Sequence, residues 1–159
     1  MAGTTIVAAR AALVAALKLR PGLAGAHVTY AWDGDDRVAR DAIWTAFSAE
    51  AADQGDITAS RVPVLRAGTK RREEEYTFVA MVEARTTGLG QQQTDERCVT
   101  LFREVEETLA ADPYLAIPGL ILSATLGGFR PLAARAEQAE HGGRACRIEA
   151  HINVRARLL

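Results

Sequence analysis

The segment that decides the fold is the last long one, CRIEAHINVRARL at residues 146–158. Apolar residues occupy every second position in it, and charged residues that include Arg147, Arg155 and Arg157 lie between them. Successive side chains of a strand point to opposite faces of a sheet, so this alternation predicts a strand with one buried and one hydrated face. Such a strand is typical of an antiparallel sheet.

A helix precedes this strand in the sequence. Its apolar residues recur three or four positions apart, which places them on one stripe of a helix. Asp95 and Glu96 are expected in its first turn, where the helix dipole favours acidic side chains. Asp112-Pro113 ends it, because the residue before a proline avoids the helical conformation. The stripe consists of Cys98, Leu101, Phe102, Val105 and Leu109.

The other apolar patterns indicate one more helix and several strands. Thr4 or Thr5 can cap a helix that begins at Ile6, and Pro21-Gly22 ends it. Further strands are expected at His27–Trp32, Ala42–Ala46, Arg61–Arg66, Glu73–Arg85 and Gly119–Leu126, although residues 37–49 also suit a helix and Pro63 restricts its strand to an edge. Turns or loops are expected at 33–36, 48–57, 67–70 and 87–90, and residues 131–143 suit either a loop or a short helix.

This order of elements predicts a single α+β domain over residues 1–159. Strands that follow one another through short turns pair antiparallel, and their apolar faces must be covered by helices. We therefore expect a mostly antiparallel sheet with two main helices packed on one face.

The composition is that of a soluble globular protein, with 48% apolar and 25% charged residues. No apolar run approaches the ~20 residues that a membrane span requires. Arg10 and Lys18 interrupt the apolar N-terminal stretch, which a signal peptide would not allow, so we expect a chain that stays in the cytoplasm. The net charge of −1 provides no overall attraction for nucleic acid.

The sequence shows no arrangement of residues that predicts catalysis, a metal site or a cofactor. Asp33, Asp35 and Asp36 lack the further oxygen ligands and the glycine of a calcium loop. The glycines at 68, 88 and 90 do not match a phosphate-binding loop, and His27, His141 and His151 lack zinc-ligand spacing. Cys98 and Cys146 are expected as buried free thiols, although a Cys98–His141 pair stays open at this point.

Charged residues are unevenly distributed along the chain. Residues 91–115 carry a local charge of −4 and residues 116–159 a local charge of +3. Such patches can match within one chain or between copies. The acidic outer face of the expected helix has Glu104, Glu106 and Glu107, and the basic face of the last strand has Arg147, Arg155 and Arg157.

The run KRREEE at residues 70–75 has two interpretations. It is either an exposed hairpin corner with weak local ion pairs or a contact between subunits in which opposite charges set the register. Both remain open. Its residues are Lys70, Arg71, Arg72, Glu73, Glu74 and Glu75.

The order and length of several segments together resemble the tail terminator, or tail completion, proteins of long-tailed bacteriophages. The matching segments are LRPGL at 19–23, HVTY at 27–30, AIW at 42–44, REEEYTFV at 72–79, VEETL at 105–109, ADP at 111–113 and VRARL at 154–158. The stretch Ala49–Lys70 matches no pattern.

The resemblance implies a virion protein at the head end of the tail, made in the host cytoplasm. It implies a homo-oligomeric ring, usually a hexamer, that caps the tail tube protein and offers a surface to the head-side connector protein. It implies that DNA passes through the ring without specific binding, and it brings no catalytic residue. The alternatives are a head–tail connector or neck subunit of the same particle, and a small ligand-binding or enzymatic α+β domain.

Overall fold

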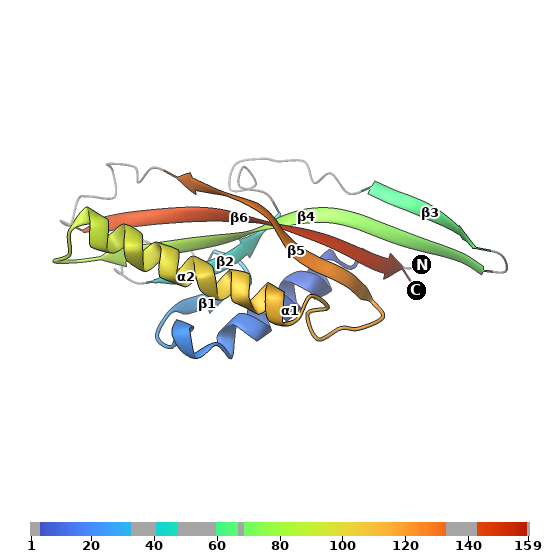
Figure 1. Cartoon of the computed structure of the whole chain (residues 1–159), viewed down its shortest axis with the longest axis horizontal. Coiled ribbons are helices and arrows are strands. Elements are labelled where there is room, and N and C mark those ends of the chain that lie inside the picture. Colours follow the sequence, from blue (N-terminus) through green and yellow to red (C-terminus); the bar gives the residue numbers. More distant parts are fainter. Residues whose placement is uncertain (1–3, 33–40, 48–59, 67–68, 133–142, 159) are drawn as a thin grey trace.

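Alternating and helical patterns produce one sheet with two helices against it in the computed structural model of the chain (Figure 1). The structure describes residues 4–32, 41–47, 60–66, 69–132 and 143–158, with only the backbone for 60–66 and 69–72. The helices are α1 (Ile6–Lys18), the short 3-10 helix η1 (Pro21–Leu23) and α2 (Gln91–Ala111). The strands are β1 (His27–Thr29), β2 (Ala42–Ala46), β3 (Ser60–Arg66), β4 (Thr69–Thr86), β5 (Ile121–Leu132) and β6 (Arg144–Leu158).

The strands form a six-stranded sheet in the order β1-β2-β4-β6-β5, and β3 also pairs with β4. Among the described strands, β1 and β2 pair parallel, and the other pairs are antiparallel. The expected α+β fold with a mostly antiparallel sheet is therefore confirmed.

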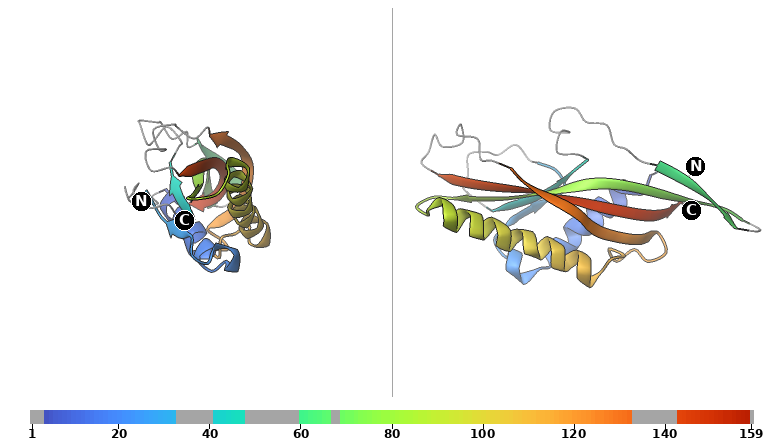
Figure 2. Two further views of the ribbon diagram at one scale, coloured as in Figure 1. Left: turned by 90° about the vertical axis from the view of Figure 1, so that its left-hand side faces the viewer. Right: turned by 45° about the horizontal axis from the view of Figure 1, so that its top comes forward.

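The core lies between the sheet and the two helices, which cover the same face (Figures 1 and 2). Apolar residues of β4 and β6 alternate toward this face, as the sequence pattern predicts. Phe78 from β4 and Ile152 from β6 are opposite one another and fully buried. α1 contributes Leu13 and Leu17, and α2 contributes the predicted stripe Cys98, Leu101, Phe102, Val105 and Leu109.

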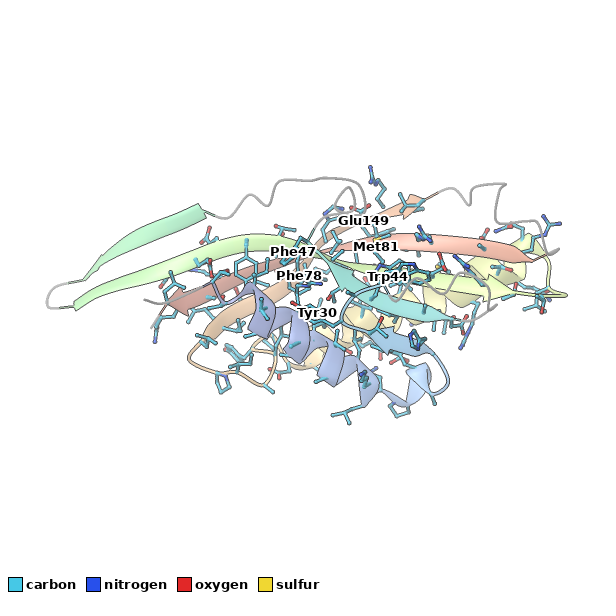
Figure 3. The ribbon with its side chains drawn as sticks, turned by 180° about the vertical axis from the view of Figure 1, so that it is seen from behind. Tyr30, Trp44, Phe47, Phe78, Met81 and Glu149 are labelled. Atoms are coloured by element: carbon cyan, nitrogen blue, oxygen red, sulfur yellow. The ribbon has the colours of Figure 1, made fainter. Side chains whose placement is uncertain are left out.

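The opposite face of the sheet, here called the open face, carries a second and smaller buried cluster of Ala42, Trp44, Val79 and Met81. Trp44 pairs with Met81, and Met81 pairs with Glu149, so these three form a row across β2, β4 and β6 (Figure 3). The ring of Trp32 lies 4.6 Å from that of Trp44, centroid to centroid.

One buried residue of α1 was not expected in the core. Arg10 is 3% exposed and donates through Nε to Thr45 Oγ1 at 3.0 Å and through Nη2 to the carbonyl of Tyr30 at 3.0 Å. Its guanidinium also lies over the rings of Tyr30 and Phe47, at 4.0 and 4.4 Å from their centroids. Burial lowers the pKa of Arg10. The residue therefore ties α1 to the ends of β1 and β2.

Several predicted boundaries are wrong. β1 ends at Thr29 instead of Trp32, and β5 begins at Ile121 and continues to Leu132, into the segment expected as loop or helix. α2 begins at Gln91, so Asp95 and Glu96 lie beyond its first turn. Ala42–Ala46 is a strand, which excludes the helical alternative there. The expected turns at 33–36 and 48–57, the remainder of 131–143 up to residue 142, and His141 lie outside the described residues.

The largest correction concerns β4. The sequence predicts a turn at residues 67–70 and a strand from Glu73, whereas the strand begins at Thr69 and includes Lys70. β3 pairs with residues 69–75 of β4, at an edge of the sheet as Pro63 predicts, and β6 pairs only with residues 72–86. The β3–β4 arm, defined as residues 60–66 and 69–72, extends beyond the rest of the sheet (Figures 1 and 2).

Candidate assembly surfaces

The three glutamates that follow the arm in sequence point to different faces of the sheet. Glu74 is 1% exposed and faces α1. Its Oε2 accepts hydrogen bonds from the backbone N of Thr5 at 2.9 Å and from Thr5 Oγ1 at 3.1 Å. The Tyr76 hydroxyl lies 3.0 Å from the same Thr5 Oγ1, and burial raises the pKa of Tyr76 to about 12. Glu74 therefore serves the folded chain by holding the start of α1.

Glu73 and Glu75 lie on the open face, where they meet Arg155 of β6. Arg155 Nε donates to Glu73 Oε2 at 2.8 Å and lies 3.6 Å from Glu75 Oε1. Both contacts are partly solvated, so each contributes little to stability. These contacts nevertheless pair Glu73 and Glu75 with a basic residue of the same subunit. The structure describes no side-chain contact for Lys70, Arg71 or Arg72.

Two further glutamates of the open face are buried and were not predicted as site residues. Glu83 is 1% exposed, accepts from Arg147 Nε at 2.7 Å and lies 2.6 Å from Arg85 Nε. Glu149 is buried between Arg130 Nη2 and His151 Nε2, each 2.9 Å from its carboxylate. Buried carboxylates need such partners. Each glutamate lies opposite an arginine on the neighbouring strand. This pairing could have indicated the two sites, but it depends on the register between strands, which the pattern of one strand does not reveal.

The flank of α2 that faces α1 is occupied by paired charges. Arg20 Nε donates to Glu104 Oε2 at 2.6 Å, and Arg20 Nη2 also pairs with Glu107. The hydrogen bond to Glu104 is the main reason that the pKa of Arg20 is raised. Gly22 gives Glu104 its space, because a Cβ at residue 22 would lie 1.9 Å from Glu104 Oε1.

The flank of α2 that faces β5 differs. The ring of Phe102 packs against that of Phe129 at 5.0 Å between centroids, and Phe129 stays 56% exposed. Val99 is also exposed on this helix. Glu106 forms no ion pair with any described residue. We call Val99, Phe102, Glu106 and Phe129 the α2–β5 seam.

Arg157 of β6, like Arg144, has no ion pair among the described residues, and the Nε of Arg157 is buried without a hydrogen-bond partner. Of the residues expected in the two charged faces, the structure thus satisfies Glu104, Glu107, Arg147 and Arg155 within the chain. Glu106 and Arg157 have no ion pair among the described residues.

The thiols and the possible metal ligands show no reactive arrangement within the described ranges. Cys98 is fully buried, its Sγ lies 3.4 Å from the carbonyl of Cys146, and burial raises the pKa of both thiols. A neutral thiol is a poor nucleophile and metal ligand. No group of three His, Cys, Asp or Glu in the described chain could hold a metal ion. None of the described helices has the length and apolar character to cross a membrane.

Comparison with known proteins supports the fold but does not place the chain in a family. No family model matches the sequence, and no curated protein matches it. Among solved structures, the chain is similar to one in the "Virion of native gene transfer agent (GTA) particle". The TM-score is 0.56 at 11% identity, and the alignment covers 93% of each chain. The similarity therefore extends over nearly the whole fold.

Proposed function

We propose that this chain is a structural virion protein that forms a ring, caps the tail tube of a phage-like particle and joins it to the head-side connector. The observation that carries the proposal is the near-complete fold similarity to a chain of the gene transfer agent virion. It agrees with the tail-terminator resemblance of the sequence, which spans segments from Leu19 to Leu158. Segment patterns carry the resemblance, and backbone positions carry the structural similarity.

The distribution of charge suits a ring of identical subunits. A closed ring uses heterologous contacts, in which one patch meets a different patch on the neighbour. Glu106 and Arg157 are unlike charges on different elements that form no ion pair with the described residues, so they fit such a contact. A DNA channel should not hold phosphates, because every phosphate that is neutralised adds salt-dependent affinity. The net charge of −1 per subunit agrees with that requirement.

In this proposal the chain acts without a cofactor, and its partners are other copies of itself, the tail tube protein and the head-side connector protein. The ring is a hexamer at the head end of the tail, as the resemblance implies. The fold similarity also fits a connector or neck subunit, because the GTA structure describes a whole virion.

Deletion of the gene in a particle-producing host separates these functions. A tail terminator that is missing leaves tails of uncontrolled length and heads without tails, as seen by electron microscopy. A missing connector leaves tails of normal length that fail to join heads. Particles of normal structure and infectivity, or purified particles in which mass spectrometry finds no copy of this chain, contradict both functions and favour a ligand-binding or enzymatic domain.

A further inference from the structure

We propose that the β3–β4 arm of one subunit docks on the α2–β5 seam of the next copy of this chain. This inference rests on the proposed ring and names the contact that builds it.

The arm is the most basic part of the chain. Residues 60–72 contain five basic and no acidic residues, and because the whole chain carries −1, the remainder carries −6. The glutamates that follow the arm have partners elsewhere, since Glu74 holds α1 and Glu73 and Glu75 contact Arg155. The basic residues are Arg61, Arg66, Lys70, Arg71 and Arg72.

The arm extends away from the acidic part of its own subunit. β3 pairs along the edge of β4 that also carries β2, whereas β5 forms the edge on the far side of β6. Figures 1 and 2 show the arm extending beyond the end of the sheet. An arm of +5 attached to a remainder of −6 therefore finds its complement on another copy.

The α2–β5 seam has the chemistry to receive it. α2 carries −3 over residues 91–111, and two of its glutamates, Glu104 and Glu107, pair with Arg20 on the opposite flank. The seam combines the unpaired Glu106 with exposed Val99 and Phe129. The arm offers the apolar residues Val62, Val64 and Leu65 between Arg61 and Arg66. Arginine and apolar side chains around a central aromatic ring are a combination enriched in protein interfaces.

The contact is expected to use side chains instead of strand addition. The register of β5 against β6 shifts at Ile121–Ser123 and at Leu126–Gly128, and Pro131 lies near its end. Bulges and proline at an edge oppose pairing with another strand. Because the arm and the seam lie at opposite edges of the sheet, repetition of the contact joins subunits head to tail, the arrangement that closes a ring.

The test is charge reversal on both sides of the contact. We expect Arg71→Glu with Arg72→Glu to weaken self-association by tenfold or more in analytical ultracentrifugation, and Glu106→Lys to do the same. Mixing these two variants should restore association above that of either alone, because the opposite charges then meet again. Glu96→Lys is the matched control, since Glu96 is exposed on α2 outside the seam and should leave association unchanged. Circular dichroism checks that each variant folds.

Cross-linking gives an independent readout. A mixture of Thr69→Cys and Phe129→Cys subunits should form a disulfide between copies under oxidation, identified by mass spectrometry. If the Glu106→Lys variant associates as the wild type does, or if the two cysteine variants give no 69–129 cross-link, the contact is wrong while the proposed function stands. A wild-type chain that neither associates nor enters particles overturns both. If the arm variant keeps its association but loses salt-dependent binding to double-stranded DNA, the arm binds nucleic acid and the proposal is wrong.

Discussion

The two flanks of α2 carry similar acidic residues, but these residues differ in their ion pairing within the subunit. On the α1 side, Glu104 and Glu107 pair with Arg20, and a Cβ at position 22 would displace the Glu104 carboxylate. On the β5 side, Glu106 has no described ion-pair partner and lies on the same helix as an exposed valine, near a half-exposed phenylalanine of β5. This difference shows that a locally charged stretch of sequence indicates an interface only after the charges that form ion pairs within the subunit have been discounted.

The largest expected effect comes from the residue on which the β5 flank rests. Phe102→Ala removes a side chain that is 5% exposed and packs on the sheet and on Phe129. We expect a loss of about 3–5 kcal/mol of unfolding free energy, measured by urea denaturation. Val99→Ala, on the exposed part of the same flank, should change the stability by less than about 0.5 kcal/mol. Equal losses for the two variants would show that the flank is closed in the free subunit.

The sequence predicted the elements that carry a complete pattern. The α2 stripe and the apolar alternation of β6 from Ile148 to Ala156 are both correct, because these side chains lie in the core. The other face of β6 is less hydrated than predicted, since Glu149 is 2% exposed. The start of α2 was missed because GQQQ at residues 90–93 has no apolar residue, and the helix begins where the Gly90 backbone N donates to Gln93 Oε1 at 3.1 Å.

Long-range pairing could not be predicted in the same way. Glu74 and Thr5 are 69 positions apart, and Arg20 and Glu104 are 84 positions apart. A charged residue looks the same in a sequence whether it faces water or a distant partner. The strand of the arm at Arg61–Arg66 was predicted, but the start of β4 was not, because the basic run at residues 70–72 interrupts the alternation from which β4 was predicted.

The next effect lies on the α1 side and depends on pH. The pKa of Tyr76 is about 12 in the folded chain, above its ordinary value of 10, mainly because the ring is buried. The neutral phenol therefore stabilises the fold below pH 10, and this contribution is lost as the pH rises from 10 to 12. Tyr76→Phe should cost about 1 kcal/mol at pH 7, through the lost Thr5 contact. It should also flatten the fall of stability above pH 10, measured by thermal denaturation. If the pH dependence of stability above pH 10 is the same in Tyr76→Phe as in the wild type, the Tyr76 ring is not buried in the folded chain.

A smaller effect is expected from the paired charges. Arg20→Ala leaves Glu104 and Glu107 without their partner and should lower the denaturation midpoint slightly. This loss of stability should be smaller in 1 M salt, because the Debye length there is only about 3 Å. Self-association should stay as in the wild type, since this flank is already satisfied. A variant that is stable but fails to associate would move the interface to the α1 side.

The smallest effect on stability is expected at Glu106. Glu106→Gln removes a charge that pairs with nothing described in its own subunit, so the unfolding free energy should change by less than about 0.5 kcal/mol. Glu104→Gln, the matched change on the other flank, should lower the denaturation midpoint by more, because it breaks the pair with Arg20. Assembly should reverse that order, with Glu106→Gln weakening self-association and Glu104→Gln leaving it intact. Equilibrium denaturation and sedimentation of the same two proteins measure both quantities. If Glu106→Gln lowers the stability more than it weakens self-association, the Glu106 carboxylate stabilises the folded subunit, and the β5 flank of α2 is not the assembly surface.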